Sequence, residues 1–180
     1  LLLVGALLWR SVTLEREQIR QRIVQVLEAL TADVDRDMER RIALLETLST
    51  SPLLLAEDWP GFYKQAKDSL RGRAYIVLTG RDGRQIINTF VPYGEQPQMT
   101  GDPATLQRIL QTREPVVSDL FTSLVVKRPV YNISIPVLRD NEVRYVMSLG
   151  LLPEGLSALL ESQSLPPDWS AAIWDGKGVT

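Results

Sequence analysis

The stretch AYIVLTGRDGRQIINT, residues 74–89, decides the fold class of this chain. Two short runs rich in branched and aromatic side chains, 74–79 and 84–90, flank a turn at 80–83 that contains Asp-Gly. An Asp-Gly pair between two apolar runs is a strong signal for a β-hairpin, because the tight turn needs backbone angles that glycine adopts at little cost. The sequence therefore predicts a pair of antiparallel strands here.

A second hairpin is predicted further along the chain. Residues 129–137 and 143–149 are apolar runs joined through 139–142, and this connection is too short for a parallel crossover. A short strand or extended segment is predicted at Val116–Phe121, and another strand at Ser170–Trp174, followed by an Asp-Gly turn. The strands of each hairpin are therefore expected to be antiparallel.

The pattern before the strands predicts one long helix over residues 11–50. Apolar residues recur there at intervals of mostly three and four, and Pro52 disfavours helical geometry in the residue before it. Such a helix either forms the spine of a domain or pairs with a copy of itself. Shorter helices are predicted at Trp59–Leu70 after an Asp58 cap, from Asp102-Pro103 to Thr112, and at Pro153–Gln163. Helices together with antiparallel hairpins indicate an α+β fold.

The first nine residues, LLLVGALLW, carry no charge and lead directly into the long helix. We interpret residues 1–9 as the outer end of a membrane-spanning helix, since a full span needs about 20 apolar residues. A buried helix end and a signal-peptide remnant are the alternatives. Arginines at positions 10, 16, 20 and 22 follow closely, and positive residues favour the cytoplasmic side, so a cytoplasmic domain also stays open.

Composition narrows the classes of function. The net charge is -2 without a basic block, so we expect no nucleic-acid partner. Cysteine and histidine are both absent, which excludes thiol chemistry and cysteine metal sites and removes the commonest general base and neutral metal ligand. We therefore expect no metal, no cofactor and no enzymatic activity in this segment. An enzyme, such as a carboxylate-dependent hydrolase using Asp119, is the disfavoured alternative.

Several motifs together resemble a known family. The long helix ends in LSTSP (48–52), and the first hairpin is followed by PVVSDLF (115–121), VYNISIPV (130–137) and VMSLGL (146–151). This arrangement resembles the extracytoplasmic Cache (PAS-like) sensor domain of bacterial transmembrane receptors, particularly sensor histidine kinases of the double-Cache type. The resemblance covers about residues 10–165, and 168–178 resembles the opening strand and turn of a second, membrane-proximal module.

The resemblance implies a five- or six-stranded antiparallel sheet with one face on the long helix and the other enclosing a ligand pocket. It divides the chain into a membrane helix end (1–9), a signalling and dimerisation helix (10–50), a membrane-distal module (51–165), and a linker with the start of a second module or closing strands (166–180). It also implies a bacterial inner-membrane protein whose sensor domain faces the periplasm, with a cytoplasmic histidine kinase or diguanylate cyclase as output.

Implied partners are a second copy of the chain, bound through the long helix, and a small ligand. Family members commonly bind amino acids, small carboxylates or amines. The amino-acid signature of the superfamily, an Arg–Tyr–Trp–Tyr–Asp set, is not clearly present, although Tyr75, Asp119, Arg128 and Tyr131 supply parts of it.

Strand alternation narrows the candidate pocket. Tyr131, Ile133, Ile135 and Val137 share an apolar face, which we expect to lie on the long helix. The opposite face carries Asn132, Ser134 and Ser148, and it is the expected pocket floor. These polar groups must be hydrogen-bonded if they are enclosed, either by a ligand or by neighbouring loops and water.

Two charged residues flank the loop 121–127. Asp119 and Arg128 could clamp the amine and carboxylate of a zwitterion, or they could form a surface pair. The complete set of candidate ligand-binding residues is Tyr75, Asn88, Asp119, Arg128, Tyr131, Asn132, Ser134 and Ser148. The leading hypothesis is a ligand-sensing domain that signals through the long helix. The alternative is a structural dimerisation spacer without a ligand of its own.

Overall fold

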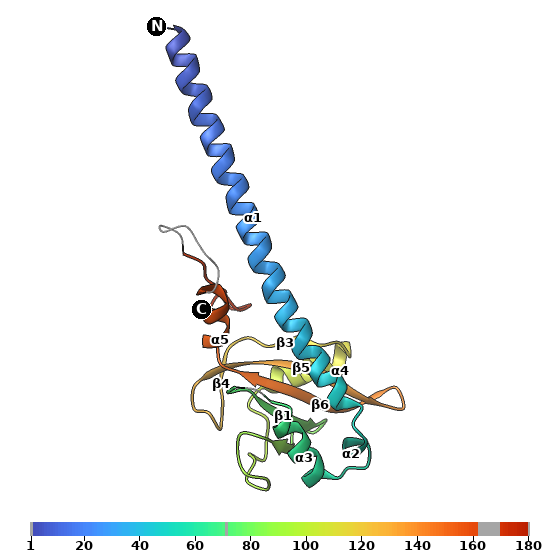
Figure 1. The fold of residues 1–180 in the computed structure, drawn as a ribbon. Coiled ribbons are helices and arrows are strands. Elements are labelled where there is room, and N and C mark those ends of the chain that lie inside the picture. Colours follow the sequence, from blue (N-terminus) through green and yellow to red (C-terminus); the bar gives the residue numbers. More distant parts are fainter. Residues whose placement is uncertain (1, 71, 162–169, 180) are drawn as a thin grey trace.

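The computed structural model describes residues 2–70, 72–161 and 170–179. Its helices are α1 (Leu2–Ser49), α2 (Pro52–Leu55), α3 (Trp59–Asp68), α4 (Pro103–Thr112) and α5 (Glu154–Glu161). Its strands are β1 (Tyr75–Gly80), β2 (Gln85–Asn88), β3 (Val116–Val117), β4 (Phe121–Thr122), β5 (Pro129–Arg139) and β6 (Glu142–Leu151). The long helix α1 reaches the sheet only with its C-terminal part, and its N-terminal part projects away from it (Figure 1).

The strands form one antiparallel sheet in the order β2-β1-β6-β5-β3, and β4 pairs with β5 beyond β3. Two predicted hairpins are confirmed. In the first, Gly83 has a φ of 84°, a left-handed conformation that favours glycine, and its N–H donates to the Gly80 carbonyl at 3.0 Å. In the second, Asp140 and Asn141 turn with φ values of 51° and 60°, and the strands run longer than predicted.

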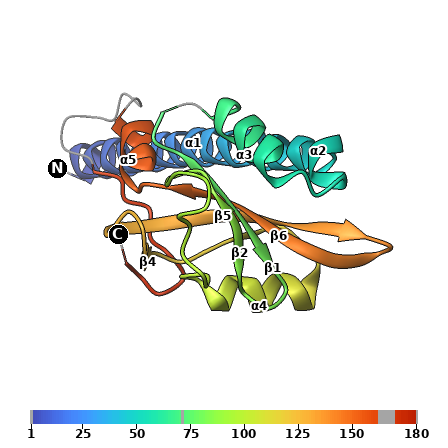
Figure 2. The same ribbon diagram turned by 90° about the horizontal axis from the view of Figure 1, so that it is seen from below.

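The molecule is built in three layers (Figure 2). Helices α1, α2, α3 and α5 lie on one face of the sheet, and α4 lies on the other. Leu45 and Leu48 of α1 pack in the main core with Ile133 of β5 and Met147 of β6. Tyr131, Ile135 and Val137 belong to the same core, so the expected placement of the apolar strand face on the long helix is confirmed.

A smaller core lies on the opposite face of the sheet. Leu106 and Ile109 of α4 pack there against Val116 of β3 and Val146 of β6. The Asp102 cap of α4 is confirmed, since its Oδ1 accepts the Thr105 N–H at 3.1 Å. Helix α4 covers only part of this face, and the polar residues of β1, β5 and β6 lie beside it.

Some sequence predictions need correction. Residues 170–174 form no strand, and the segment is irregular up to the turn at 175–179. The segment Val116–Phe121 is divided into β3 and β4, because residues 118–120 leave the edge of β5. Helix α2 was not predicted; it is a short turn of helix that begins at Pro52, capped by Ser51.

The long helix ends one residue before its predicted end but begins at Leu2, nine residues before its predicted start. The other boundaries are close to those predicted. Helix α5 begins one residue after the predicted Pro153 start and is described as far as Glu161, and its predicted end at Gln163 lies outside the described residues. Residues 166–169, the start of the predicted linker, lie outside the described residues. Within the described ranges, no helix combines the length and apolar character that crossing a membrane requires.

Candidate functional site

The polar face of the sheet forms the floor of a small, partly open space, which we call the polar cavity. Its volume is about 30 Å³, and a space of about 10 Å³ adjoins it toward Ser134 and Thr105. The floor comes from β1, β5 and β6, with Tyr75, Asn132 and Ser148 among the lining residues. The cover comes from residues 97–102 and 121–125. The residues of the expected pocket floor therefore line this space and the one that adjoins it, and the space is only large enough for a water molecule or a small polar head group.

Two acceptor atoms at this cavity lack a hydrogen-bond partner. They are Oδ2 of Asp102 and Oδ1 of Asn132, and both are buried without a donor among the residues that the structure describes. The Asp102 carboxylate uses only its other oxygen, which caps α4. Leaving a buried acceptor unpaired costs about 1–3 kcal/mol, and more for a charged group. The pair of orphaned acceptors therefore favours a ligand that brings hydrogen-bond donors.

The two serines of the floor satisfy each other. Ser134 and Ser148 are directly opposite in the β5–β6 register, and the Ser134 hydroxyl donates to Ser148 Oγ at 2.8 Å. Ser134 is fully buried and Ser148 nearly so. This pair hydrogen-bonds between two strands of the floor, a partner that differs from the ligand and from the loops and water that the sequence suggested.

Tyr75 and Asn88 also line the polar cavity. The Tyr75 hydroxyl lies 3.4 Å from Ser123 Oγ, and burial raises the pKa of Tyr75 while this hydrogen bond lowers it in part. Asn88 is satisfied at both ends of its amide, since Nδ2 donates to Gln85 Oε1 at 3.0 Å and Oδ1 accepts the Phe90 N–H at 3.1 Å. Both residues therefore shape the wall more than they offer free polar groups.

Asp119 and Arg128 do not form the clamp that the sequence suggested. Arg128 is exposed and pairs with Glu154 of α5. Asp119 accepts the Gly176 N–H at 2.9 Å and lies 3.5 Å from Lys177 Nζ. Neither residue lines the polar cavity. The irregular segment between β3 and β5 carries the two side chains to different neighbours, which sequence spacing could not reveal.

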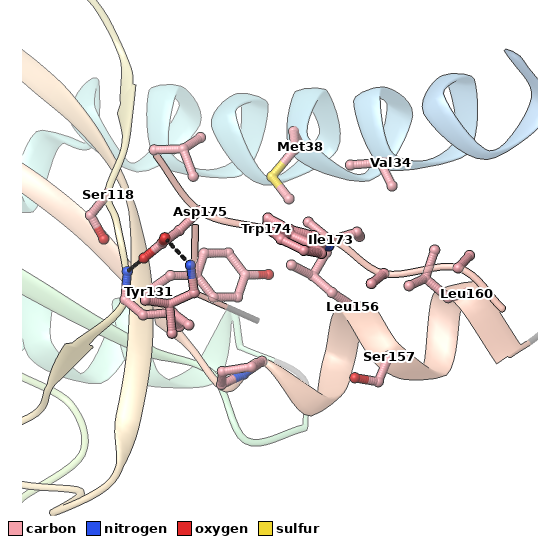
Figure 3. A pocket seen from close by; sticks show the side chains of 16 residues that line it. Val34, Met38, Ser118, Tyr131, Leu156, Ser157, Leu160, Ile173, Trp174 and Asp175 are labelled. Carbon is pink, nitrogen blue, oxygen red and sulfur yellow. Dashed lines mark hydrogen bonds between the residues drawn. The ribbon is translucent and has the colours of Figure 1, made fainter. Parts of the chain in front are cut away.

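Tyr131 enters a different space, on the helix face of the sheet. This apolar cavity of about 570 Å³ lies between α1, β5, α5 and residues 171–179. Figure 3 shows Tyr131, Met38 and Leu156 converging on it. Burial raises the pKa of Tyr131 to about 12, with Arg41 lowering it and Asp37 raising it by smaller amounts. The side chains of Tyr131 and Asn132 thus lie on opposite faces of the sheet.

Asp102 is the site residue that sequence reasoning missed. It was assigned only as a helix cap, and a cap needs one carboxylate oxygen. The second carboxylate oxygen of Asp102 indicates a ligand only because it is buried without a partner among the described residues. The sequence does not predict that burial. Within the part of the chain that the structure describes, no lysine or arginine lines the polar cavity. Its polar groups are one carboxylate and neutral hydroxyl and amide groups.

Solved structures share this fold. The sensory domain of the Campylobacter jejuni chemoreceptor Tlp3 matches with a TM-score of 0.59 and 14% identity, over 79% of this chain and 63% of that one. The ligand-binding domain of the Pseudomonas fluorescens chemoreceptor CtaA, in complex with L-isoleucine, matches with a TM-score of 0.57 and 12% identity, over 76% and 58%. The ligand-binding domain of the Pseudomonas aeruginosa amino acid chemoreceptor PctC, in complex with GABA, matches with a TM-score of 0.54 and 18% identity, over 77% of this chain and 71% of that one.

These similarities are in structure and not in sequence. No family model matches the sequence, and no curated protein matches it either. The chain spans about three fifths of the Tlp3 and CtaA domains. The fold is therefore the α+β, PAS-like fold of Cache-type chemoreceptor sensor domains, with a long N-terminal helix on an antiparallel sheet.

Proposed function

We propose that this chain is a ligand-sensing domain of a signal-transduction receptor and that its polar cavity binds the head group of a small amine. The observation that carries this proposal is the pair of unpaired buried acceptors, Asp102 Oδ2 and Asn132 Oδ1. An ammonium group offers three N–H donors and a positive charge. It would satisfy both acceptors and neutralise the Asp102 carboxylate.

The lining favours an amine over a carboxylate or an amino acid. A bound carboxylate needs a cation or several donors, and the described lining holds no lysine or arginine. It would also lie against the Asp102 carboxylate, where like charges repel. The structural neighbours CtaA and PctC were solved with L-isoleucine and GABA, both amino acids. The proposal therefore assigns this chain a ligand that keeps the amino group and lacks the carboxylate.

The size of the cavity sets a second condition. A volume of about 30 Å³ holds the head group alone. The rest of an amine must displace part of the cover, which includes Pro97, Thr100 and Gly101 beside the half-exposed Met99. A ligand that moves this cover gives the domain two states with different affinity, which is the requirement for sensing.

A matched series of compounds tests the proposal. Thermal unfolding of the protein is followed with n-butylamine, butyrate and GABA, and with longer and quaternary amines, each paired with its carboxylate analogue. A ligand that binds only the folded state raises the unfolding midpoint in a saturable way. We expect amines to raise it and carboxylates to leave it unchanged. Shifts with carboxylates or amino acids alone would contradict the amine assignment, and no shift with any compound would favour the structural spacer.

The cellular setting is a further part of the proposal. We infer a domain outside the cytoplasm, in the bacterial periplasm, anchored in the inner membrane by the segment that includes residues 1–9. The fold shared with chemoreceptor sensor domains supports this setting. A cytoplasmic histidine kinase or diguanylate cyclase would be the output. Fusion of a reporter enzyme that works only in the periplasm, placed after residue 180, tests the location in cells.

We also propose that two copies pair through α1. Ile23, Val24 and Leu27 are 37%, 46% and 54% exposed on the part of α1 that projects from the sheet. Exposed apolar side chains at this spacing favour a helix pair. Sedimentation should show a dimer that Leu27→Lys dissociates, whereas Arg40→Glu, at an exposed position of the same helix, should leave it intact. If the unmodified protein and Arg40→Glu are both monomers, pairing through this helix is contradicted.

A further inference from the structure

The turn at residues 175–179 is fastened to residues 119 and 120, which follow β3 at the edge of the sheet. Asp175 and Val179 of the turn line the apolar cavity together with Leu120. The Asp175 carboxylate closes the turn, because its Oδ1 accepts the N–H groups of Lys177 at 2.9 Å and Val179 at 2.8 Å. Its Oδ2 accepts the Leu120 N–H at 3.1 Å (Figure 3). The pKa of Asp175 is lowered, chiefly because the Val179 N–H donates to the carboxylate. The charged form of Asp175 therefore holds the turn together and against residue 120.

In a second set of contacts, the turn supplies the N–H donor and residue 119 supplies the carboxylate acceptor. The Gly176 N–H donates to Asp119 Oδ1 at 2.9 Å, and Lys177 Nζ lies 3.5 Å from Asp119 Oδ2. A Cβ on residue 176 would lie 2.8 Å from Asp119 Oδ1, so a side chain there would push the Asp119 carboxylate out of its present position. The turn and the sheet edge thus each supply a carboxylate that accepts a backbone N–H from the other.

The partner of the turn is residues 118–120, which we call the coupling segment. It leaves the edge of β5 between β3 and β4. At its start, the Ser118 N–H donates to the Asn132 carbonyl at 2.9 Å, and the Asn132 N–H donates to Ser118 Oγ at 2.9 Å. At its end comes Phe121, which lines the polar cavity. Asn132 of the polar cavity therefore holds the start of the coupling segment, and Phe121, another cavity residue, follows its end.

We propose that the coupling segment links the polar cavity to the 175–179 turn, so that a change inside the cavity alters how firmly the turn is fastened. Asn132 is the junction, because its backbone holds Ser118 while its side-chain Oδ1 lacks a partner in the cavity. Turn residues lie more than 50 positions along the chain from this segment, so the link cannot be local. The use of this link in signalling rests on the proposed function, but the link itself exists without a ligand.

Amide hydrogen exchange measured by NMR tests the link in the unliganded protein. Asn132→Asp places a second carboxylate beside Asp102 and leaves the turn untouched. Ser118→Ala removes the acceptor of the Asn132 N–H. In both variants we expect the Leu120 and Gly176 amides to exchange about tenfold faster, as in a local opening. Gly176→Ala breaks the fastening directly, and its effect on the Leu120 amide sets the upper limit.

The controls separate a local effect from general destabilisation. Ser69→Ala removes a serine hydroxyl that bonds a backbone carbonyl at the end of α3, and it should leave both amides unchanged. The Ile76 amide, bonded to Thr89 Oγ1 at 2.8 Å in the core, should keep its rate in all variants.

Two results would overturn the link. One is exchange at Leu120 and Gly176 within about twofold of the unmodified protein in both variants, and the other is an equal rise at Ile76. If Asn132→Asp fails to fold, Asn132→Ala, which changes the same side chain inside the polar cavity, replaces it. If the variants leave the exchange rates unchanged and the protein binds an amine, the link is refuted and the proposed function stands. If the variants exchange faster and no amine binds, the link stands and the proposed function is refuted.

Discussion

Tyr131 and Asn132 are consecutive residues of β5, and their side chains enter two different cavities on opposite sides of the sheet. Tyr131 reaches the apolar cavity beside α1, and Asn132 reaches the polar cavity under residues 97–102. The alternation of a strand makes this separation unavoidable. A single strand therefore touches both the ligand site that we propose and the long helix that would carry a signal.

The Ser134–Ser148 pair should behave as one unit. Ser134→Ala or Ser148→Ala alone leaves the other hydroxyl buried without its partner, and each should lower the free energy of unfolding by about 1–2 kcal/mol. The double variant should cost less than the sum of the singles by about 0.5 kcal/mol or more, because no orphaned hydroxyl remains. Urea unfolding of the four proteins measures this. Strict additivity would mean that the 2.8 Å contact contributes nothing.

Gly150 should tolerate no side chain. A Cβ there would lie 2.2 Å from Cζ of Tyr75, whose ring is buried and packs edge-on against Phe90. Gly150→Ala should therefore destabilise the domain by about 1–3 kcal/mol through overpacking. Gly155 is the matched control, because nothing lies within 4 Å of its added Cβ, and Gly155→Ala in α5 should be neutral or slightly stabilising. Equal effects at both positions in thermal unfolding would contradict this reading of the Tyr75 contact.

Much of the fold could be predicted from the sequence. The hairpin at 74–90, the α4 helix with its Asp102 cap and the apolar face of β5 follow from turn chemistry, capping and alternation, which are local properties. The path of residues 118–120 and the partners of Asp119 and Arg128 could not be predicted in this way. Those depend on contacts between residues far apart in the chain, such as Asp119 with Gly176. The missing strand at 170–174 has the same cause, since a strand needs a partner edge and its own residues cannot supply one.

The candidate site was predicted in part for a similar reason. Asn132, Ser134 and Ser148 were identified because alternation places them on one face. Asp102 was not identified, because its second oxygen becomes an unpaired acceptor only when the cover closes over it. Tyr131 was included in the predicted site although the same alternation placed it on the helix face, and it lies in the apolar cavity.

Tyr131 should make the domain sensitive to alkaline pH. Its pKa is about 12 in the folded protein against 10.0 for a free side chain, so the unfolded chain loses the proton first. This contribution is fully present below pH 10 and is lost as the pH rises from there toward 12. A shift of this size corresponds to a loss on the order of 2 kcal/mol.

Tyr131→Phe removes the titrating group and tests this contribution. Unfolding of the variant, measured between neutral pH and the alkaline limit, should fall less steeply than that of the unmodified protein. Tyr93→Phe changes an exposed hydroxyl and should leave the slope unchanged. A slope for Tyr131→Phe identical to that of the unmodified protein would refute the assignment.

Asp102→Asn should leave the unliganded domain at least as stable as before. Asparagine keeps the capping oxygen for the Thr105 N–H, and the substitution removes the charge of a carboxylate whose Oδ2 is buried without a partner among the described residues. Asp58→Asn is the matched control, since Asp58 caps α3 through the Gly61 N–H at 3.2 Å. Thermal unfolding without ligand should show no loss for either variant. A marked loss for Asp102→Asn alone would mean that the carboxylate stabilises the unliganded fold.

Calorimetric titration of the amine that stabilises the protein most, into the unmodified protein and these two variants, tests the central claim most directly. The account predicts saturable binding to the unmodified protein and to Asp58→Asn, and binding weaker by at least about tenfold in Asp102→Asn, because the ammonium group loses its charged partner. Equal affinity for all three proteins would place the amine elsewhere and contradict the assignment of the polar cavity as the ligand site.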